Sequence, residues 1–308
     1  MPRVYWRGDP LAGCRPGRRG HPELVAAGVT FIKENLMNNN IVLITGASSG
    51  IGKATAKLLL SHGFKVYAGA RRVENLKELE YLGASIMPLD VTDEASLKSA
   101  VDMVLEAEGR LDVLINNAGY GAHGAIEDIP MSEARRQFDV NLFGLARLTQ
   151  LALPIMRKRG SGKIINISSI AGKISMPLGG WYHATKYALE AYSDALRAEV
   201  SRFGIDIILI EPGAIKTEWD AVAMANLSKY SGSGPYADLT GRLTGKFRAG
   251  YRAGAPGPEV VARTILKALN SDHPAARYAV PFQARLILFM KWLLPDGALD
   301  LIIRFLLR

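Results

Sequence analysis

Three side chains near the middle of the chain have types and spacings that suit proton transfer. Tyr182 and Lys186 are four residues apart on a stretch with helical character, so the phenol and the ammonium group lie on one helix face. An ammonium group nearby favours the phenolate, which predicts that Tyr182 acts as an acid or a base near neutral pH. This spacing is common by chance, but Ser169 lies thirteen residues upstream, at the carboxyl end of a predicted buried strand. Its hydroxyl is expected to face the same crevice.

A glycine-rich turn, Thr45–Gly52, gives a second chemical signal. Its glycines permit a tight turn and the close approach of a ligand to the backbone. The turn links a predicted strand to a predicted helix, the context in which a pyrophosphate rests on the amides of a helix N-terminus. The predicted cofactor contacts in this turn are Gly46, Ser48, Ser49, Gly50, Ile51 and Gly52. A plain structural turn is the alternative.

The end of the second predicted strand indicates which dinucleotide binds. An acidic residue here accepts hydrogen bonds from the adenosine ribose of NAD, whereas this chain has Ala70, Arg71 and Arg72. Arginine can clamp a 2′-phosphate with two hydrogen bonds, so NADP(H) is the preferred cofactor and NAD(H) the alternative. The arginines could instead form a solvated helix entrance. Asp90, followed by Val91, is predicted to hold the adenine edge, although it could equally cap the next helix.

These residues need a framework that brings them together, and the chain alternates strand and helix signals from Ile41 onward. Short β-branched apolar runs bounded by glycine are typical of strands buried on both faces of a parallel sheet. The predicted strands are Ile41–Ile44, Lys65–Gly69, Ser85–Leu89, Val113–Ile115, Lys163–Ile167, Asp206–Ile210 and Arg277–Val280. About seven strands separated by helices predict an α/β protein with a doubly wound Rossmann fold, a parallel sheet with helices on both faces.

The order and spacing of the motifs resemble a known family. From Ile41 to about Lys216 the chain resembles a classical short-chain dehydrogenase/reductase. The motifs that carry the resemblance are Thr-Gly-x-x-x-Gly-x-Gly, Asn116-Asn117-Ala118-Gly119, Asn141, Ser169, Tyr182-x-x-x-Lys186 and Pro212-Gly213. The segment Gly180–Glu190 is similar to the branch that contains 17β-hydroxysteroid dehydrogenases, retinol dehydrogenases and acyl-dihydroxyacetone-phosphate reductases.

The resemblance implies a role for each motif residue. Ser169 would hydrogen-bond the substrate carbonyl, Tyr182 would deliver the proton, and Lys186 would bind the nicotinamide ribose and lower the pKa of the tyrosine. Asn141 would hold a water that links Lys186 to solvent. Cofactor contacts are implied for Asn117, Ala118, Gly119, Tyr182, Lys186, Pro212, Gly213 and Thr217. Read from the residues alone, the two asparagines after the fourth strand could simply satisfy backbone groups of a turn.

Together these features predict an NADP(H)-dependent oxidoreductase that interconverts a carbonyl and a primary or secondary alcohol by hydride transfer. Apolar residues predict a pocket for a steroid-, retinoid- or lipid-like substrate, and the alternative is that several fill the core or a subunit interface. These residues are Ile170, Ile174, Met176, Pro177, Leu178, Trp219, Val222 and Met224. Two other functions are a reductase of small polar carbonyls and a dinucleotide-binding sensor without catalysis.

The predicted domain organisation is a flexible N-terminal extension at 1–36, a catalytic domain at 37–280 and an amphipathic C-terminal extension at 281–308. Three hypotheses account for the composition of the first segment: a disordered extension, an organelle-targeting segment, or upstream sequence included by a wrongly placed start, with Met37 as the true start. The last has apolar stretches too short to span a bilayer, which could lie in a membrane interface or cover a partner subunit. Segment 228–257 lacks a sustained period and is predicted to be an irregular substrate loop.

Composition limits the partners and the compartment. The formal charge of +9 comes from Lys and Arg scattered along the chain, which argues against nucleic-acid binding. A single cysteine, Cys14, allows no intrachain disulfide, and the five histidines have no metal-ligand spacing. The cytoplasm is the expected location, with peripheral membrane contact through the C-terminus as the alternative to packing on protein. Apolar faces at Asn141–Met156 and Tyr182–Phe203 predict a homo-oligomer.

Overall fold

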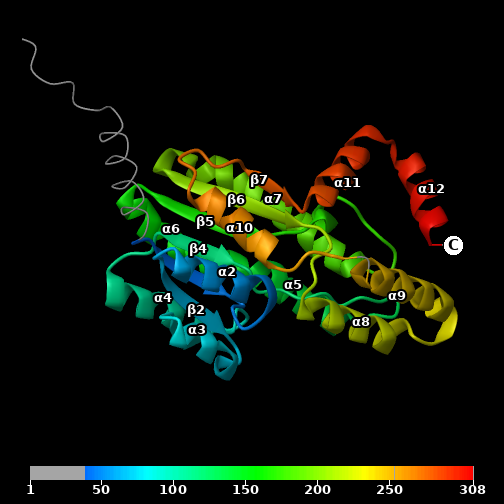
Figure 1. The fold of residues 1–308 in the computed structure, drawn as a ribbon, viewed down its shortest axis with the longest axis horizontal. Helices are drawn as coiled ribbons and strands as arrows, with labels where there is room; N and C mark the ends of the chain where they lie inside the picture. Colours follow the sequence, from blue (N-terminus) through cyan, green and yellow to red (C-terminus); the bar gives the residue numbers. More distant parts are fainter. Residues whose placement is uncertain (1–38, 253, 308) are drawn as a thin grey trace, which may run out of the picture. The chain divides into compact units, whose positions relative to one another are not determined.

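The computed structural model describes residues 39–252 and 254–307. Within them, seven strands form one parallel sheet in the order β3-β2-β1-β4-β5-β6-β7 (Figure 1). The strands are β1 (Ile41–Thr45), β2 (Lys65–Ala70), β3 (Ser85–Pro88), β4 (Val113–Asn116), β5 (Gly162–Ile167), β6 (Ile205–Pro212) and β7 (Arg277–Val280). All seven predicted strands and the predicted fold class are confirmed, with strand ends shifted by one or two residues.

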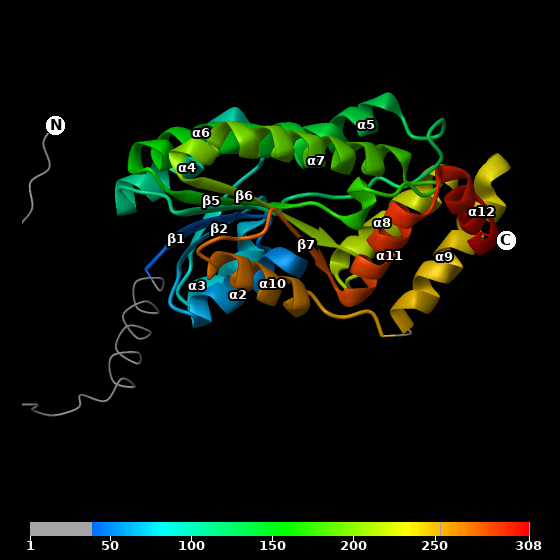
Figure 2. The same ribbon diagram turned by 90° about the horizontal axis from the view of Figure 1, so that it is seen from above.

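Helices cover both faces of the sheet (Figure 2). One face carries α2 (Gly50–Ser61), η1 (Val73–Leu76), α3 (Lys77–Tyr81) and α10 (Glu259–Leu269). The other face carries α4 (Glu94–Glu108), α5 (Met131–Phe138), η2 (Asp139–Phe143), α6 (Gly144–Arg159), α7 (Gly180–Val200) and η4 (Ser201–Phe203). Along β1, Val42 and Ile44 face the first layer while Ile41 and Leu43 face the second. Because both faces are buried, every position of this strand is apolar except the last.

The strand order reverses between β1 and β4, where successive connections run to opposite edges of the sheet. Ligands of doubly wound sheets bind outside the carboxyl ends of the strands at such a point. The glycine-rich turn follows β1, and Asn117 follows β4. Ser169 follows β5 and Gly213 follows β6. The sheet therefore brings the main sequence motifs to one edge.

The predicted irregular loop at 228–257 is mostly helical, so that prediction was wrong. The segment contains the end of α8 (Glu218–Ser231), then η5 (Gly234–Tyr236) and α9 (Ala237–Arg252). Leu239, Leu243 and Phe247, spaced by four residues, pack in one apolar cluster. Gly241 and Gly245 face open space, so they make the segment glycine-rich without preventing the helix.

The two apolar C-terminal stretches form α11 (Phe282–Leu293) and α12 (Asp296–Leu306). In α11 only Ala284 is buried, and it packs against Gly213, where an added Cβ would lie 3.2 Å from the Ala284 Cβ. No helix among residues 39–252 and 254–307 is long and apolar enough to cross a membrane. The predicted extension at 1–36 lies outside the described residues, and the three-segment division stays a prediction.

Candidate active site

The glycine-rich turn Thr45–Gly52 has no room for larger side chains at two of its glycines. Gly46 has a φ of +65°, a left-handed conformation that favours glycine. A Cβ on Gly46 would lie 2.9 Å from the Ala118 Cα, and one on Gly52 would lie 2.5 Å from the Asn117 Nδ2. The turn is therefore a cradle lined by backbone, which fits the pyrophosphate of a dinucleotide.

The N-terminus of α2 opens onto this cradle. Ser49 precedes the helix and its side chain does not cap it, so this side chain does not compete for the N-terminal amides. Ser48, Ser49 and Ile51 are half-buried in the turn. A Cβ on Gly50 would lie 3.4 Å from the Thr217 Cβ. Thr217, predicted to contact the cofactor, therefore lies against the phosphate turn.

The residues that end β2 differ in exposure. Ala70 is buried, whereas Arg71 and Arg72 are exposed. Burial raises the pKa of Asp90, but hydrogen bonds from Thr92 and the charge of Arg71 outweigh burial and bring this pKa below its usual value. Arg71 and Asp90 thus act on each other electrostatically across the region predicted to receive the adenosine end of the cofactor.

Asp90 shapes the loop that follows β3. Its Oδ1 accepts hydrogen bonds from the Thr92 amide at 3.0 Å and from the Thr92 hydroxyl at 2.8 Å. The alternative that Asp90 caps the next helix was wrong, because Asp93 caps α4 by accepting from the Ala95 amide at 3.0 Å. Val91, the next predicted contact, is buried.

Asn117 joins the glycine-rich turn to the end of β4. Its side-chain amide donates to the Thr45 carbonyl at 2.9 Å and to the Gly46 carbonyl at 3.0 Å. The backbone amides of Asn117 and Ala118 both donate to the Thr45 hydroxyl at 3.0 Å. Gly119 follows, where a Cβ would lie 3.2 Å from the Asn141 Oδ1. The asparagine motif therefore fixes the cradle and satisfies turn backbone groups at once.

A chain of buried amides extends from the sheet to the helices above it. The Asn116 side chain donates to the Asn166 Oδ1 at 2.9 Å and to the Thr149 hydroxyl at 3.1 Å. The Asn166 side chain in turn donates to the Ser193 hydroxyl of α7 at 3.0 Å. Since buried polar groups are costly without partners, these bonds define one position for α6 and α7 on the sheet.

Ser169 is the N-cap of η3 (Ile170–Gly172) and lies two residues after the end of β5. Its hydroxyl accepts from the Ala171 amide at 3.1 Å and donates to the Pro212 carbonyl at 3.2 Å. Pro212 ends β6, and the Gly213 amide donates back to β7. The carboxyl end of the neighbouring strand therefore orients the Ser169 hydroxyl.

Tyr182 and Lys186 lie on the first two turns of α7, both buried. The Tyr182 phenol lies close enough to the Ser169 side chain for that side chain to lower the pKa of the phenol. The Lys186 Nζ lies 5.9 Å from the centre of the Tyr182 ring and donates to the Ile167 carbonyl at 2.8 Å. The structure thus brings the three predicted catalytic side chains to one place beside the cradle.

Burial dominates the ionisation of this group. It raises the pKa of Tyr182 to about 12, while the Ser169 side chain lowers this pKa in part. Burial also lowers the pKa of Lys186 to about 8, against the charge of Glu190. The predicted lowering of this pKa by Lys186 stays a prediction. A phenol with a raised pKa keeps its proton, which is the form that a proton donor requires.

Asn141 lies in the π-helical turn η2 between α5 and α6 and is almost fully buried. Its Oδ1 accepts from the Tyr120 amide at 3.0 Å, and its Nδ2 donates to the Tyr120 carbonyl at 2.9 Å. The Nδ2 also donates to the Thr185 hydroxyl at 3.1 Å, one residue before Lys186. Asn141 therefore connects the loop after β4 to α7, and its water-holding role stays a prediction.

Two aromatic side chains pack directly on Tyr182. The rings of Trp219 and His123 lie 5.1 Å and 5.5 Å from the Tyr182 ring, and burial lowers the pKa of His123 to about 4. Trp219 was predicted as pocket wall, whereas His123 was missed. A signal existed, because His123 lies in the loop at the carboxyl end of β4. Within the described residues, no group of three or more His, Cys, Asp or Glu side chains can hold a metal ion.

A surface cavity of about 640 Å³ lies along the N-terminal part of α7, and Ser169, Tyr182 and Lys186 are not among the residues that line it. Its walls include Met176 and Pro177 from the loop after η3, His183 of α7, and Ile303 of α12. Leu178 and Met224, by contrast, pack in an apolar cluster with residues of α8 and α9. Of the predicted pocket residues, Met176 and Pro177 therefore line the cavity, whereas Val222 is exposed on the surface.

Fold and site together define a dinucleotide-binding α/β protein with a Ser–Tyr–Lys centre. The family model described as short chain dehydrogenase matches residues 40–227. The chain is 38% identical over 271 residues to 3-ketodihydrosphingosine reductase of Bacteroides thetaiotaomicron, covering 87% of this chain and 98% of that protein. It is 35% identical over 267 residues to NADPH-dependent 3-dehydrocapnine reductase of Ornithobacterium rhinotracheale, covering 84% and 94%.

A solved structure agrees with these sequence relatives. A short-chain dehydrogenase from Streptomyces avermitilis superposes with a TM-score of 0.73 at 35% identity, covering 87% of this chain and 94% of that one. The chain therefore belongs to the short-chain dehydrogenase family and is an oxidoreductase. The branch suggested by segment Gly180–Glu190 stays a prediction.

Proposed function

We propose that this protein is an NADP(H)-dependent oxidoreductase that interconverts a carbonyl and an alcohol on a hydrophobic, lipid-like substrate. One observation carries the proposal. The hydroxyls of Ser169 and Tyr182 meet beside Lys186, at the carboxyl ends of strands that also hold the glycine cradle. Two donors on one oxygen and an adjacent dinucleotide cradle suit carbonyl reduction.

NADPH, when bound, supplies the hydride that reaches the carbonyl carbon. The chain's own residues handle the oxygen. Ser169 exchanges its bond to the Pro212 carbonyl for one to the substrate oxygen, and Tyr182 transfers its proton to that oxygen as negative charge develops. Lys186 holds positive charge next to the phenol, which stabilises the phenolate that remains. In alcohol oxidation the proton moves the opposite way.

The cofactor preference is supported by the end of β2. The two residues directly after Ala70 are Arg71 and Arg72, and neither is acidic. Both are exposed, so their side chains are accessible to a ligand. A guanidinium at this place pairs with a 2′-phosphate, whereas a ribose hydroxyl gains little from it. The relative from Ornithobacterium rhinotracheale is named as NADPH-dependent, which supports the same preference.

The substrate class is supported by the cavity beside α7. Met176, Pro177 and Ile303 give it apolar walls, and Asp300 and Arg304 of α12 add charges at one side. The relative from Bacteroides thetaiotaomicron is named as a reductase of 3-ketodihydrosphingosine, a lipid ketone. A long-chain ketone with a polar end therefore fits better than a small polar carbonyl.

The test is oxidation of NADPH and NADH with a panel of sphingoid, steroid, retinoid and small polar carbonyls. Tyr182→Phe is expected to bind NADPH normally and to lose turnover by about a hundredfold or more. Tyr81→Phe, at an exposed tyrosine of α3, is the control and keeps full turnover. Undiminished turnover by Tyr182→Phe would refute the catalytic assignment. Cofactor binding without reduction or alcohol oxidation of any compound would favour the sensor.

A second proposal concerns the C-terminal helices as a contact for an anionic lipid surface. Large apolar side chains of α11 and α12 are exposed, namely Phe282, Leu286, Ile287, Phe289, Met290, Trp292, Leu293, Leu301, Ile302 and Phe305. The charged residues of α11 are Arg285 and Lys291, both basic, in a chain of net charge +9. Aromatic and aliphatic groups with basic neighbours suit an interface with acidic headgroups. The adjacent cavity would then receive a lipid substrate near the surface of a cytoplasmic membrane leaflet.

Co-sedimentation of the full chain with phosphatidylcholine vesicles, with and without phosphatidylglycerol, tests this contact. Trp292→Glu is expected to abolish binding, whereas Tyr81→Glu, the same change at another exposed aromatic residue, keeps it. No binding, or equal binding by both variants, would contradict the proposal. Light scattering reports whether a second copy covers this face instead, and it also tests the predicted homo-oligomer at α6 and α7.

A further inference from the structure

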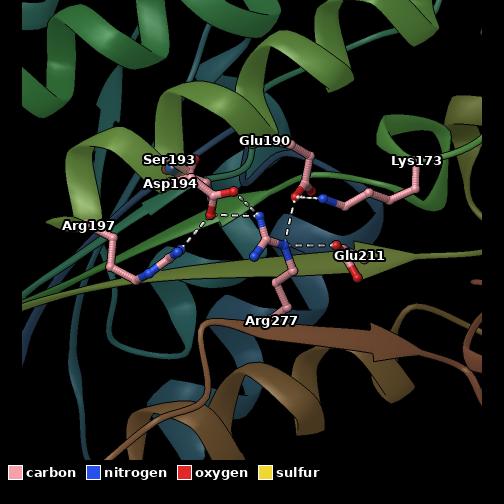
Figure 3. A network of polar contacts seen from close by, with 8 residues as sticks. Lys173, Glu190, Ser193, Asp194, Arg197, Glu211 and Arg277 are labelled. Atoms are coloured by element: carbon pink, nitrogen blue, oxygen red, sulfur yellow. Dashed lines mark hydrogen bonds and ion pairs between the residues drawn. The ribbon is translucent and has the colours of Figure 1, made fainter. Parts of the chain in front are cut away.

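A cluster of charged side chains joins α7, β6 and β7, and no step of the proposed reaction uses it (Figure 3). It consists of Lys173, Glu190, Asp194, Arg197, Glu211 and Arg277. Glu190 of α7 is 4% exposed and Glu211 of β6 is 3% exposed, so two carboxyl groups lie deep in the protein. Carboxylates are rarely this buried unless each has partners.

The cations of the cluster form closer contacts with Glu190 than with Glu211. The Glu190 Oε2 accepts from the Arg277 Nε at 3.0 Å and pairs with the Lys173 Nζ at 2.9 Å. The far end of the Arg277 guanidinium donates to both Asp194 oxygens at 2.7 Å. The Glu211 Oε1 lies 3.4 Å from the same Arg277 Nε and forms no hydrogen bond. The single Nε proton already points to Glu190.

Glu211 therefore needs a different hydrogen-bonding arrangement. A protonated carboxyl group supplies its own donor, and the Glu190 Oε1 is a buried acceptor without another partner. The Glu190 Oε2 and the Glu211 Oε1 lie 3.0 Å and 3.4 Å from the same Arg277 Nε, so the two carboxyl groups are neighbours. Burial first, and then the charge of Glu190, raise the pKa of Glu211 to about 7.

We propose that Glu190 and Glu211 share one proton and that this pair positions the catalytic side chains, an inference that rests on the proposed function. Glu190 lies two helical turns beyond Tyr182 on α7. Glu211 directly precedes Pro212, whose carbonyl accepts the Ser169 hydroxyl at 3.2 Å. The shared proton thus joins the helix that carries the phenol to the strand end that orients the serine.

The same cluster holds the short helix after Ser169. Lys173 ends this segment and pairs with Glu190, and a Cβ on Gly172 would lie 2.9 Å from the Glu190 Cγ. The charges that face the pair are Lys173 from η3, Arg277 from β7, and Asp194 and Lys186 from α7. When the shared proton leaves, two adjacent negative charges repel in a site with little water, and α7 moves relative to β6.

The variant Glu211→Gln tests the proposal, because its amide donates to Glu190 at every pH. For the unmodified protein, kcat for carbonyl reduction is expected to fall about tenfold between about pH 7 and pH 9, since small displacements of catalytic groups cost this much. Glu211→Gln is expected to lose most of that fall while its KM for NADPH stays unchanged. Glu211→Leu, which cannot donate, is expected to have a low kcat at every pH. Glu199→Gln, at an exposed carboxylate of the same helix outside the cluster, is the control and follows the unmodified protein.

A measurement that needs no substrate tests the shared proton independently of the proposed function. Infrared difference spectra of the full chain are expected to show a protonated carboxyl band at neutral pH that disappears at alkaline pH and is absent from Glu211→Gln. Absence of that band, or equal pH profiles for the unmodified protein and Glu211→Gln, overturns the shared proton. If no substrate is reduced by either protein, the proposed function fails, and the infrared band alone decides whether the pair shares a proton.

Discussion

Replacing Gly52 by alanine is expected to destabilise the protein and to weaken dinucleotide binding. The new Cβ would lie 2.5 Å from the Asn117 Nδ2 and would overlap the Gly46 carbonyl oxygen, so one of them must move. The Asn117 side chain holds the cradle through two hydrogen bonds, each worth about 1 kcal/mol. Overpacking adds about 1 to 3 kcal/mol, and the better helix propensity of alanine returns about 1 kcal/mol. The expected net loss is about 2 to 4 kcal/mol.

Urea denaturation measures the loss of stability, and NADPH titration followed by fluorescence measures the loss of binding. Gly241→Ala is the matched control, because Gly241 also lies in a helix but faces open space. This change should stabilise the protein by about 0.5 to 1 kcal/mol through helix propensity. If Gly52→Ala proved as stable as the unmodified protein and bound NADPH equally well, the claim that close packing at position 52 requires glycine would be refuted.

Three further predictions concern the cofactor, the buried carboxyl pair and the buried amides. Arg71→Ala should lower kcat/KM for NADPH by about tenfold or more and leave kcat/KM for NADH nearly unchanged. Arg135→Ala, at another exposed arginine, is the control and should change neither value. Equal losses for both cofactors would contradict a contact between Arg71 and the 2′-phosphate. Glu211 has a raised pKa of about 7, so the folded state keeps its proton while the unfolded state loses it. Stability should therefore fall by up to about 3 kcal/mol as pH rises from about 4.5 to about 7, and thermal denaturation of Glu211→Gln should lack this fall. Asn166→Leu should cost about 2 to 4 kcal/mol in urea denaturation, because it leaves buried partners on Asn116 and Ser193 unpaired.

The strands and the placement of Tyr182 and Lys186 on one helix face were predictable for a local reason. Strands buried on both faces have continuous apolar runs, and the spacing of Tyr182 and Lys186 places both on one helix face without reference to other elements. The helix α9 was missed because its glycines suggested a loop, although the spacing of its apolar residues was helical. Gly241 and Gly245 of this helix face open space, whereas Leu239, Leu243 and Phe247, spaced by four residues, form the face that packs.

Contacts between distant segments were not predictable in the same way. His123 and Trp219 meet on Tyr182 only because the loop after β4 packs against the start of α8. Arg277 and Glu190 are 87 residues apart in the sequence, and each by itself resembles a polar surface position. No local period encodes such pairs, because they depend on the order of strands in the sheet.

The helix α7 shows how polar contacts fix the catalytic geometry. Its side chains are held by hydrogen bonds at Thr185 to η2 and at Ser193 to β5, and by ion pairs at Glu190 to β7 and η3. Hydrogen bonds and ion pairs have directional partners, so they set the position of a helix more narrowly than apolar packing does. The apolar residues of the adjacent cavity are not part of these contacts. Changes such as Met176→Leu should therefore alter substrate preference while the positions of Ser169 and Tyr182 stay fixed.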